Sequence, residues 1–230
     1  MFKFSPYSNY ELLTAQADGH SIMYDTRLPA HHKVFDVAFS QGLQSVKSVR
    51  CIDFHPVNSN QFIMGGEAGT NLQIYDRRKV SSDYCTGYPV HEYSLDSFFN
   101  GDMYELDQTF PNRLSTGPTS RRFSDDNVSI SWLKYNKAGT KLLVNCMGGD
   151  IICLDLREMD GKLYDSCKVN VSTQMECENR KYKPNVAHNI FFGADNKQTF
   201  LKTAHFFGPK DEYIVAGSDV GRAFIWNSKT

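Results

Sequence analysis

Short runs of hydrophobic residues alternate with polar turns along this chain, and one order of runs recurs four times. Each copy has an apolar run, a turn rich in Gly, Asp or Asn, and a second run closing on an aromatic or large apolar residue. The four copies cover residues 12–25, 62–76, 141–155 and 213–226. Alternation with a period of two is typical of β-strands that bury one face, and Gly, Asp and Asn favour tight turns. The pattern therefore predicts pairs of antiparallel strands.

Another short strand precedes the last three copies and ends in a turn. It is expected at about 49–54, 128–135 and 202–207. Before the first copy only Phe2-Lys3-Phe4-Ser5-Pro6 remains of this strand, so we expect the chain to begin inside a repeat. Three strands in one fixed order form an antiparallel meander. A period of several tens of residues indicates a stacked repeat fold.

Four such repeats predict an all-β fold of the β-propeller type, with about four recognisable blades in a single region, 1–230. The repeat cores are expected at about 2–27, 45–79, 127–157 and 200–228. The copies lie farther apart than the ~40–45 residues of a usual WD-repeat blade. The excess falls in two long polar insertions, about 81–126 and 158–199, in which Tyr93-Ser94-Leu95 and residues 168–171 are the candidate outer strands.

Composition and charge narrow the range of partners. The chain has 230 residues, of which 40% are hydrophobic and 22% charged, as in an ordinary globular protein with a substantial core. The formal net charge of −1 gives no electrostatic argument for direct binding to nucleic acid or to a membrane surface. Because the sequence has no apolar run of about 18 residues and no secretory signal pattern, we expect a cytoplasmic or nuclear protein.

The sequence shows no motif of known catalytic chemistry. It has no glycine-rich phosphate loop, no His-Glu-x-x-His and no Gly-x-Ser-x-Gly. The six cysteines and seven histidines do not have the spacing of a zinc site. We therefore expect no enzyme, no cofactor and no metal, and an enzyme hidden in the insertions is the least favoured alternative.

Three of the four copies end on an apolar residue followed by Asp-x-Arg. They read Tyr24-Asp25-Thr26-Arg27, Tyr75-Asp76-Arg77-Arg78 and Leu154-Asp155-Leu156-Arg157, whereas the fourth ends at Trp226-Asn227. An aspartate at a strand end can accept hydrogen bonds from nearby amides, or pair with the arginine two residues on, which emerges on the same side. Either each pair ties its repeat to a neighbour, or the three arginines form a multipoint anchor for a partner protein.

These residues carry a resemblance to a known family. The segment 12–27 resembles the WD-box, with its WD-x-R ending, shared by substrate receptors of cullin-4 RING ubiquitin ligases. Residues 74–78 and 207–226 resemble the later blades of the cullin-4-associated WD-repeat factors, including the adipose-type group. The likeness covers the four repeat cores, about half of the chain. Since the family has a fuller propeller, the resemblance implies that this region belongs to a larger ring of about seven blades.

The resemblance also implies roles for single residues. In that family the WD-x-R arginine docks the receptor on the large adaptor subunit, the damage-specific DNA-binding protein, which links it to the cullin. Arg27 and Arg78 are then the first adaptor-binding candidates, and Arg157 is the third because Leu154 replaces the usual aromatic residue. The residues that would orient these arginines are Tyr24, Asp25, Tyr75, Asp76 and Asp155. The fourth copy has Asn227 in place of Asp and receives no adaptor role.

By this resemblance, the chain is expected to be a non-enzymatic receptor that brings an unidentified protein substrate to the ligase. Its arginine-bearing face would hold the adaptor, and its central or opposite face would contact the substrate. Two alternatives stay open: a scaffold subunit of another nuclear or cytoplasmic complex, and a fragment of a longer propeller. Ser124, three residues after Arg121, is a candidate phosphorylation site in the first insertion.

Overall fold

The computed structural model describes residues 1–29, 32–39, 47–67, 71–80, 89–95, 129–147, 151–157, 188–191, 193–194, 196 and 203–228. Within these ranges the regular structure is β-strand, apart from one short 3-10 turn, Arg77–Lys79. The expected all-β class is therefore confirmed.

No helix in the described ranges is long and apolar enough to cross a membrane.

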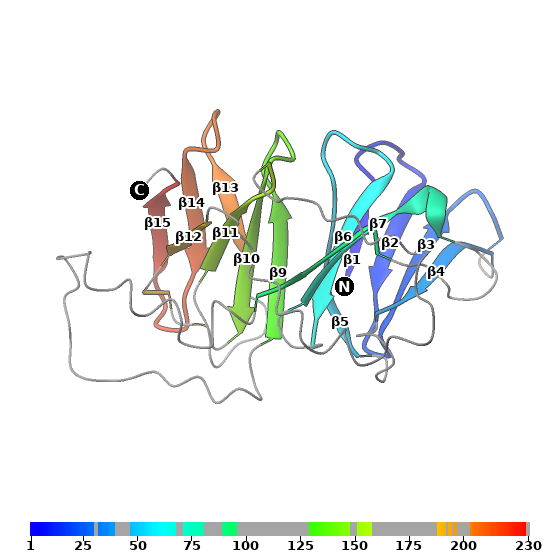
Figure 1. Ribbon diagram of the computed structural model, residues 1–230, viewed down its shortest axis with the longest axis horizontal. Coiled ribbons are helices and arrows are strands. Elements are labelled where there is room, and N and C mark those ends of the chain that lie inside the picture. Colours follow the sequence, from blue (N-terminus) through cyan, green and yellow to red (C-terminus); the bar gives the residue numbers. More distant parts are fainter. Residues whose placement is uncertain are drawn as a thin grey trace, which may run out of the picture.

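The strands form four antiparallel sheets, each made of consecutive strands (Figure 1). Sheet A contains β1 (Phe2–Phe4), β2 (Glu11–Ala15), β3 (His20–Asp25) and β4 (Lys33–Ala38). Sheet B contains β5 (Val49–Phe54), β6 (Gln61–Gly66), β7 (Asn71–Asp76) and β8 (His91–Ser94). Sheet C contains β9 (Ser129–Tyr135), β10 (Lys141–Met147), β11 (Ile151–Asp155) and β12 (His188–Phe191). Sheet D contains β13 (Ala204–Phe207), β14 (Tyr213–Gly217) and β15 (Ala223–Asn227).

Two details differ from the sequence-based expectation. Sheet A contains a strand that the repeat core at 2–27 does not include, because β4 pairs with β3 and makes a four-stranded sheet with β2 and the short β1, whose Phe2 lies opposite Thr14. In sheet C the outermost strand is β12, which pairs with β11, whereas the candidate 168–171 lies outside the described residues. Both differences concern edge strands, whose short and partly polar sequences give a weak alternation signal.

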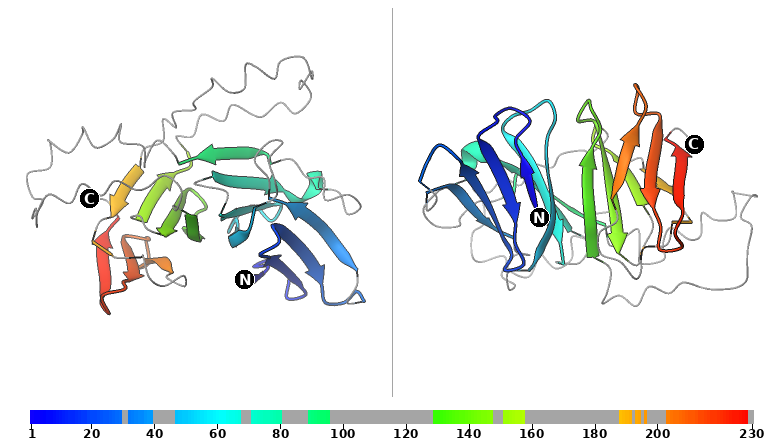
Figure 2. Two further views of the ribbon diagram at one scale, coloured as in Figure 1. Left: turned by 90° about the horizontal axis from the view of Figure 1, so that it is seen from below. Right: turned by 180° about the vertical axis from the view of Figure 1, so that it is seen from behind.

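The four sheets pack face to face in chain order. Figure 2 shows them around an open arc, with β1, β5, β9 and β13 on the inner side. These first strands lie against one another, since β5 contacts both β1 and β9, and β13 contacts β9. The described residues do not close into a ring.

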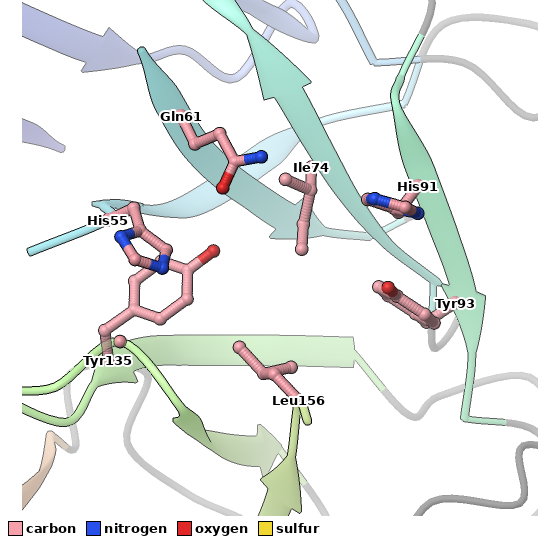
Figure 3. Close-up of a pocket in the computed structure, with 8 residues that line it drawn as sticks. His55, Gln61, Ile74, His91, Tyr93, Tyr135 and Leu156 are labelled. Atoms are coloured by element: carbon pink, nitrogen blue, oxygen red, sulfur yellow. The ribbon is translucent and has the colours of Figure 1, made fainter. Parts of the chain in front are cut away.

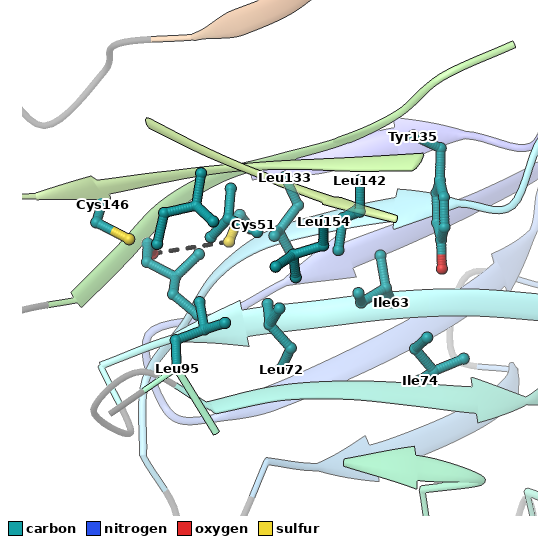
Figure 4. Close-up of a cluster of buried hydrophobic side chains, with 13 residues drawn as sticks. Cys51, Ile63, Leu72, Ile74, Leu95, Leu133, Tyr135, Leu142, Cys146 and Leu154 are labelled. Carbon is teal, nitrogen blue, oxygen red and sulfur yellow. Dashed lines mark hydrogen bonds between the residues drawn. The ribbon is translucent and has the colours of Figure 1, made fainter. Parts of the chain in front are cut away.

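Alternation of side chains along the central strands lets sheets B and C bury both of their faces. In β6, Phe62 and Met64 belong to the layer shared with sheet A, whereas Ile63 belongs to the layer shared with sheet C. The B–C layer is drawn in Figure 4, where the thiol of Cys51 donates a hydrogen bond to the Ile130 carbonyl at 3.7 Å. These layers hold the strand ends of neighbouring sheets side by side.

The outer faces of sheets A and D differ from the shared layers. On sheet A, Phe2 and Phe4 are 62% and 60% exposed, and on sheet D, Phe207 and Ile225 are 62% and 66% exposed. Phe62, at the A–B layer, is only 1% exposed. Apolar side chains therefore continue onto the two end faces of the stack, where the described residues do not cover them.

Candidate partner-binding surface

The three Asp-x-Arg motifs occupy equivalent places in sheets A, B and C. Each aspartate ends the third strand and pairs with the first residue of the second strand. The pairs are Glu11 opposite Asp25, Gln61 opposite Asp76 and Lys141 opposite Asp155, and Tyr213 opposite Asn227 is the counterpart in sheet D. Because the sheets stack in order, all these strand ends lie along one edge, the upper edge in Figure 1. We call it the Asp-x-Arg edge.

Each aspartate holds the arginine two residues later by three hydrogen bonds that recur in every copy, and Asp25 Oδ2 accepts a fourth from Arg27 Nε at 3.2 Å. Asp25 Oδ1 accepts from the Arg27 backbone N at 3.0 Å and from Arg27 Nε at 2.9 Å, and Asp25 Oδ2 accepts from Arg27 Nη2 at 2.5 Å. The same three bonds recur at Asp76 with Arg78 and at Asp155 with Arg157. Charge-assisted bidentate pairs fix direction as well as distance. The motif thus sets the orientation of the guanidinium group.

The carboxylates are covered while the guanidinium groups are exposed. The aspartate side chains at positions 25, 76 and 155 are 9–13% exposed, and the arginine side chains at 27, 78 and 157 are 59–68% exposed. Hydrogen bonds from Arg27 lower the pKa of Asp25 to about 2. The pKa values of Asp76 and Asp155 are lowered by their arginines in the same way. All three pairs are therefore ionised at neutral pH.

A different arginine joins neighbouring sheets at this edge. Arg77 donates from Nη1 and Nη2 to the two oxygens of Glu11, at 2.9 and 2.8 Å, and so connects sheet B to sheet A. The Asp-x-Arg bonds instead lie within single turns. The Arg27 guanidinium also lies 4.8 Å from the centre of the Tyr10 ring, a cation–π contact. Neither Arg77 nor Tyr10 was singled out from sequence, because Glu11 is 66 residues from Arg77 and Tyr10 lies outside the motif.

The motif tyrosines point away from the aspartates. Tyr75 is 1% exposed, stacks on Phe62 with ring centres 5.4 Å apart, and donates its hydroxyl to Gln73 at 2.8 Å. Tyr24 is half-buried and pairs opposite Leu12. Strand alternation places each tyrosine on the opposite face from the aspartate that follows it. The structure thus gives Tyr75 a packing role in the layer between sheets A and B. Ser124, the candidate phosphorylation site, lies outside the described residues.

In sheet D, the described part of the equivalent turn is held by hydrogen bonds of Ser228. After Asn227, the Ser228 hydroxyl donates to the Asp211 carbonyl at 2.9 Å, and the Ser228 backbone N donates to the Glu212 carbonyl at 2.8 Å.

A second charged cluster, which the sequence did not predict, lies among the innermost strands. Asp53 of β5 accepts from Lys3 of β1 at 2.7 Å and faces Lys134 Nζ of β9 at 3.3 Å. The same carboxylate accepts from the Tyr135 backbone N at 2.9 Å. Asp53 is only 5% exposed at its side chain and joins three sheets. We call these residues, with Trp132 and His205, the central cluster.

Aromatic groups extend the central cluster toward sheet D. Lys3 Nζ lies 4.8 Å from the centre of the Trp132 ring, whose edge-on neighbour at 5.7 Å is His205 of β13. Burial lowers the pKa of Lys3, while Asp53 acts in the opposite direction. Burial and the two lysines also lower the pKa of His205. Two lysines facing one carboxylate leave an excess of positive charge there.

Comparisons with known proteins give a partial match. No protein family matches the chain. A stretch of 69 residues, 29% of the chain, is 33% identical to Protein ALTERED SEED GERMINATION 2 of Arabidopsis thaliana, and the match spans 9% of that protein. The described residues include no group of three His, Cys, Asp or Glu side chains that could hold a metal ion.

Proposed function

We propose that this chain is part of a WD-repeat β-propeller and acts as a substrate receptor of a cullin-4 ubiquitin ligase. The observation that carries the proposal is the repeated geometry of the Asp-x-Arg edge. Three arginines are exposed, and each is held by its own aspartate at the same register of a successive sheet. Arg27, Arg78 and Arg157 would dock on the ligase adaptor, the damage-specific DNA-binding protein.

The packing of the sheets supports the propeller. Sheets of consecutive antiparallel strands pack face to face with their first strands innermost, as blades do around a central axis. The exposed Phe2 and Phe4 on sheet A and the exposed Phe207 and Ile225 on sheet D suit cover by further blades. A larger ring, of which this chain supplies four blades, would bury all of these side chains.

Preorganisation makes the arginines suitable anchors. Ordering a flexible side chain at an interface costs about 0.5–1.5 kcal/mol. The bidentate bonds to Asp25, Asp76 and Asp155 already orient the three guanidinium groups before a partner arrives. Arginine is also enriched among residues that dominate binding energy. The adaptor surface facing this edge would supply carboxylate or carbonyl oxygens to the remaining donors.

The protein itself would perform no chemistry in this role. We propose no catalytic residue, cofactor or metal, because ubiquitin transfer belongs to the ligase. The central cluster, with its excess positive charge at Lys3 and Lys134, is the candidate contact for an acidic segment of the unidentified protein substrate. Such a receptor would act in the cytoplasm or nucleus, without direct contact to nucleic acid or membrane.

A scaffold subunit of another complex is the second candidate. The bidentate pair between Arg77 and Glu11 favours it, because this pair shows that arginines at the same edge also serve to join sheets. In that case the Asp-x-Arg pairs would stabilise their turns, and the adaptor would not bind.

The experiment that separates these candidates is a pull-down of the adaptor from cell extract. The baits are the wild-type chain, the double variant Arg27→Glu/Arg78→Glu, and the control Arg222→Glu. Arg222 is exposed and precedes β15, at the opposite strand end from Asn227. We expect the wild type and the control to capture the adaptor and the double variant to lose it. Circular dichroism establishes that all three are folded, and failure of the folded wild type to bind would refute the proposal.

A further inference from the structure

A cavity of about 220 Å³ opens between sheets B and C (Figure 3). Its walls come from β6, β7, β8 and the turn after β5 on one side, and from β9 and the turns after β9 and β11 on the other. Ile74 and Leu156 supply apolar surface, and His91 and Tyr93 supply stacked rings whose centres are 6.1 Å apart. The cavity is therefore partly aromatic and partly aliphatic.

The Tyr135 hydroxyl is a buried polar group without a partner in this cavity. Tyr135 is 4% exposed, and its hydroxyl makes no hydrogen bond to any described residue. Figure 3 shows this hydroxyl pointing between Gln61 and Ile74, toward the middle of the cavity. Leaving a buried donor without a hydrogen-bond partner is energetically unfavourable. The unsatisfied hydroxyl of Tyr135 therefore indicates that the cavity binds a group able to form a hydrogen bond with it.

Other polar groups around the cavity are also available. The side chains of Gln61, His91 and Tyr93 make no hydrogen bond to another described residue. Burial raises the pKa of Tyr93 to about 12, and burial with the nearby Lys79 lowers the pKa of His91. At neutral pH the cavity thus offers uncharged donors and acceptors to an occupant.

The cavity lies between two of the exposed arginines. Gln61 pairs in the sheet with Asp76, the aspartate that holds Arg78. Leu156 is the residue between Asp155 and Arg157, and its backbone N donates to the Thr140 carbonyl at 2.8 Å. A protein docked on the Asp-x-Arg edge would therefore cover the cavity and could insert a side chain into it.

The volume of the cavity and the polarity of its lining indicate which chemical group could bind there. Small-molecule sites usually have about 300–1,000 Å³, so this cavity suits a single side chain. None of the described lining residues is Asp, Glu, Lys or Arg, and a charged group would lose its hydration without a counter-charge. An aromatic ring with one hydroxyl would stack beside Tyr93 and satisfy Tyr135. Tyrosine is also among the residues that dominate interface energy.

We propose that the cavity binds one tyrosine side chain of the protein that docks on the Asp-x-Arg edge. The inference rests on the proposed function, in which that protein is the ligase adaptor. The inserted phenol exchanges hydrogen bonds with Tyr135 and Gln61, and its ring packs on Ile74 and Leu156. Arg78 and Arg157 flank the opening and engage the surrounding surface of the partner.

The first test uses the isolated protein and p-cresol, which has the side chain of tyrosine. Amide chemical shifts are followed by NMR during titration with p-cresol, and with toluene, which lacks the hydroxyl. The variants are Tyr135→Phe, which removes the unsatisfied hydroxyl, and the control Tyr213→Phe on the exposed face of sheet D. We expect saturable shifts around Leu156, and affinity about three- to tenfold weaker for toluene and for Tyr135→Phe. Absence of saturable binding, with only water in the cavity, would overturn the proposal.

The second test measures adaptor binding by Leu156→Trp, which fills the cavity, beside Arg27→Glu/Arg78→Glu. We expect Leu156→Trp to lose p-cresol binding and to bind the adaptor at least about tenfold more weakly. If Leu156→Trp binds the adaptor like the wild type while the double variant does not, the proposed function stands and the tyrosine insertion is refuted. If the wild type binds p-cresol but not the adaptor, the proposed function is refuted. The proposal that the cavity binds a tyrosine of the adaptor is then refuted as well.

Discussion

The Asp-x-Arg edge and the central cluster use the same chemistry in opposite ways. At the edge, Asp25 holds an arginine two residues away, and that arginine is 59% exposed. In the centre, Asp53 is 5% exposed and holds cations that lie 50 and 81 residues away, on two other sheets. A local pair presents a charge to the outside. A non-local pair joins elements of the fold.

The two regions should therefore respond differently to mutation. Exposed ion pairs contribute little to stability, because solvent screens them and ordering the side chains costs entropy. Removing one partner of a buried pair leaves an uncompensated charge away from water. We expect substitutions in the central cluster to act on folding, and substitutions at the Asp-x-Arg edge to act on binding.

The largest effect is expected for Asp53→Ala. It leaves Lys3 without its carboxylate and the Tyr135 amide without its acceptor. The free energy of unfolding should fall by about 3–5 kcal/mol, measured by urea denaturation. Asp155→Ala, at the edge, serves as the control and should lose far less. An equal loss of unfolding free energy in Asp53→Ala and Asp155→Ala would contradict the expected difference between the central cluster and the Asp-x-Arg edge.

A smaller effect is expected for Arg77→Gln. This substitution breaks the bidentate pair with Glu11 between sheets A and B, in which both side chains are largely covered. We expect a loss of about 1–2 kcal/mol, between the values for exposed and for buried pairs. The adjacent Arg78→Gln is the matched control and should leave the urea midpoint unchanged. A larger loss in Arg78→Gln would show that the Asp-x-Arg pair holds the sheets.

The smallest effect is the titration of the edge carboxylates. The pKa of Asp25 is lowered from 3.8 to about 2 by its hydrogen bonds to Arg27. Because this pKa is lower in the folded state, the contribution of the pair to stability is present above the unfolded pKa and is lost as pH falls through about 2. Carboxyl 13C NMR should give a midpoint near 2 in the wild type. In Arg27→Gln the midpoint should rise but stay below 3.8, because the backbone N of residue 27 still donates to Asp25. An unchanged midpoint would mean that Arg27 does not hold Asp25.

Local features of this molecule were predictable from sequence, and non-local ones were not. The strands of the four repeats follow from alternation. The Asp-x-Arg pairs follow from the short spacing of the motif, although each arginine lies in the turn after its strand and not on the strand itself. The same alternation rule would have assigned Tyr75 to the core. The partner of Arg77 and the three-sheet contacts of Asp53 depend on how separate sheets pack, so no spacing in the sequence reveals them.

The cavity between sheets B and C was likewise not predictable from the sequence. Its wall residues Gln61, Tyr93 and Tyr135 come from different strands of two sheets, and each alone is an ordinary half-apolar residue. Their common feature is the space between the sheets, which depends on packing. Ser124 and the candidate strand at 168–171 fall outside the described residues, so they stay predictions from sequence.

The most direct test of the central claim is the affinity of the purified adaptor for the purified chain, measured by calorimetry. The samples are the wild type, Arg27→Glu/Arg78→Glu and the control Arg222→Glu. If the edge arginines are the anchors, the double variant should bind about a hundredfold more weakly or not at all, and the control should match the wild type. A folded double variant that binds within about twofold of the wild type would contradict the role of the Asp-x-Arg edge in adaptor binding.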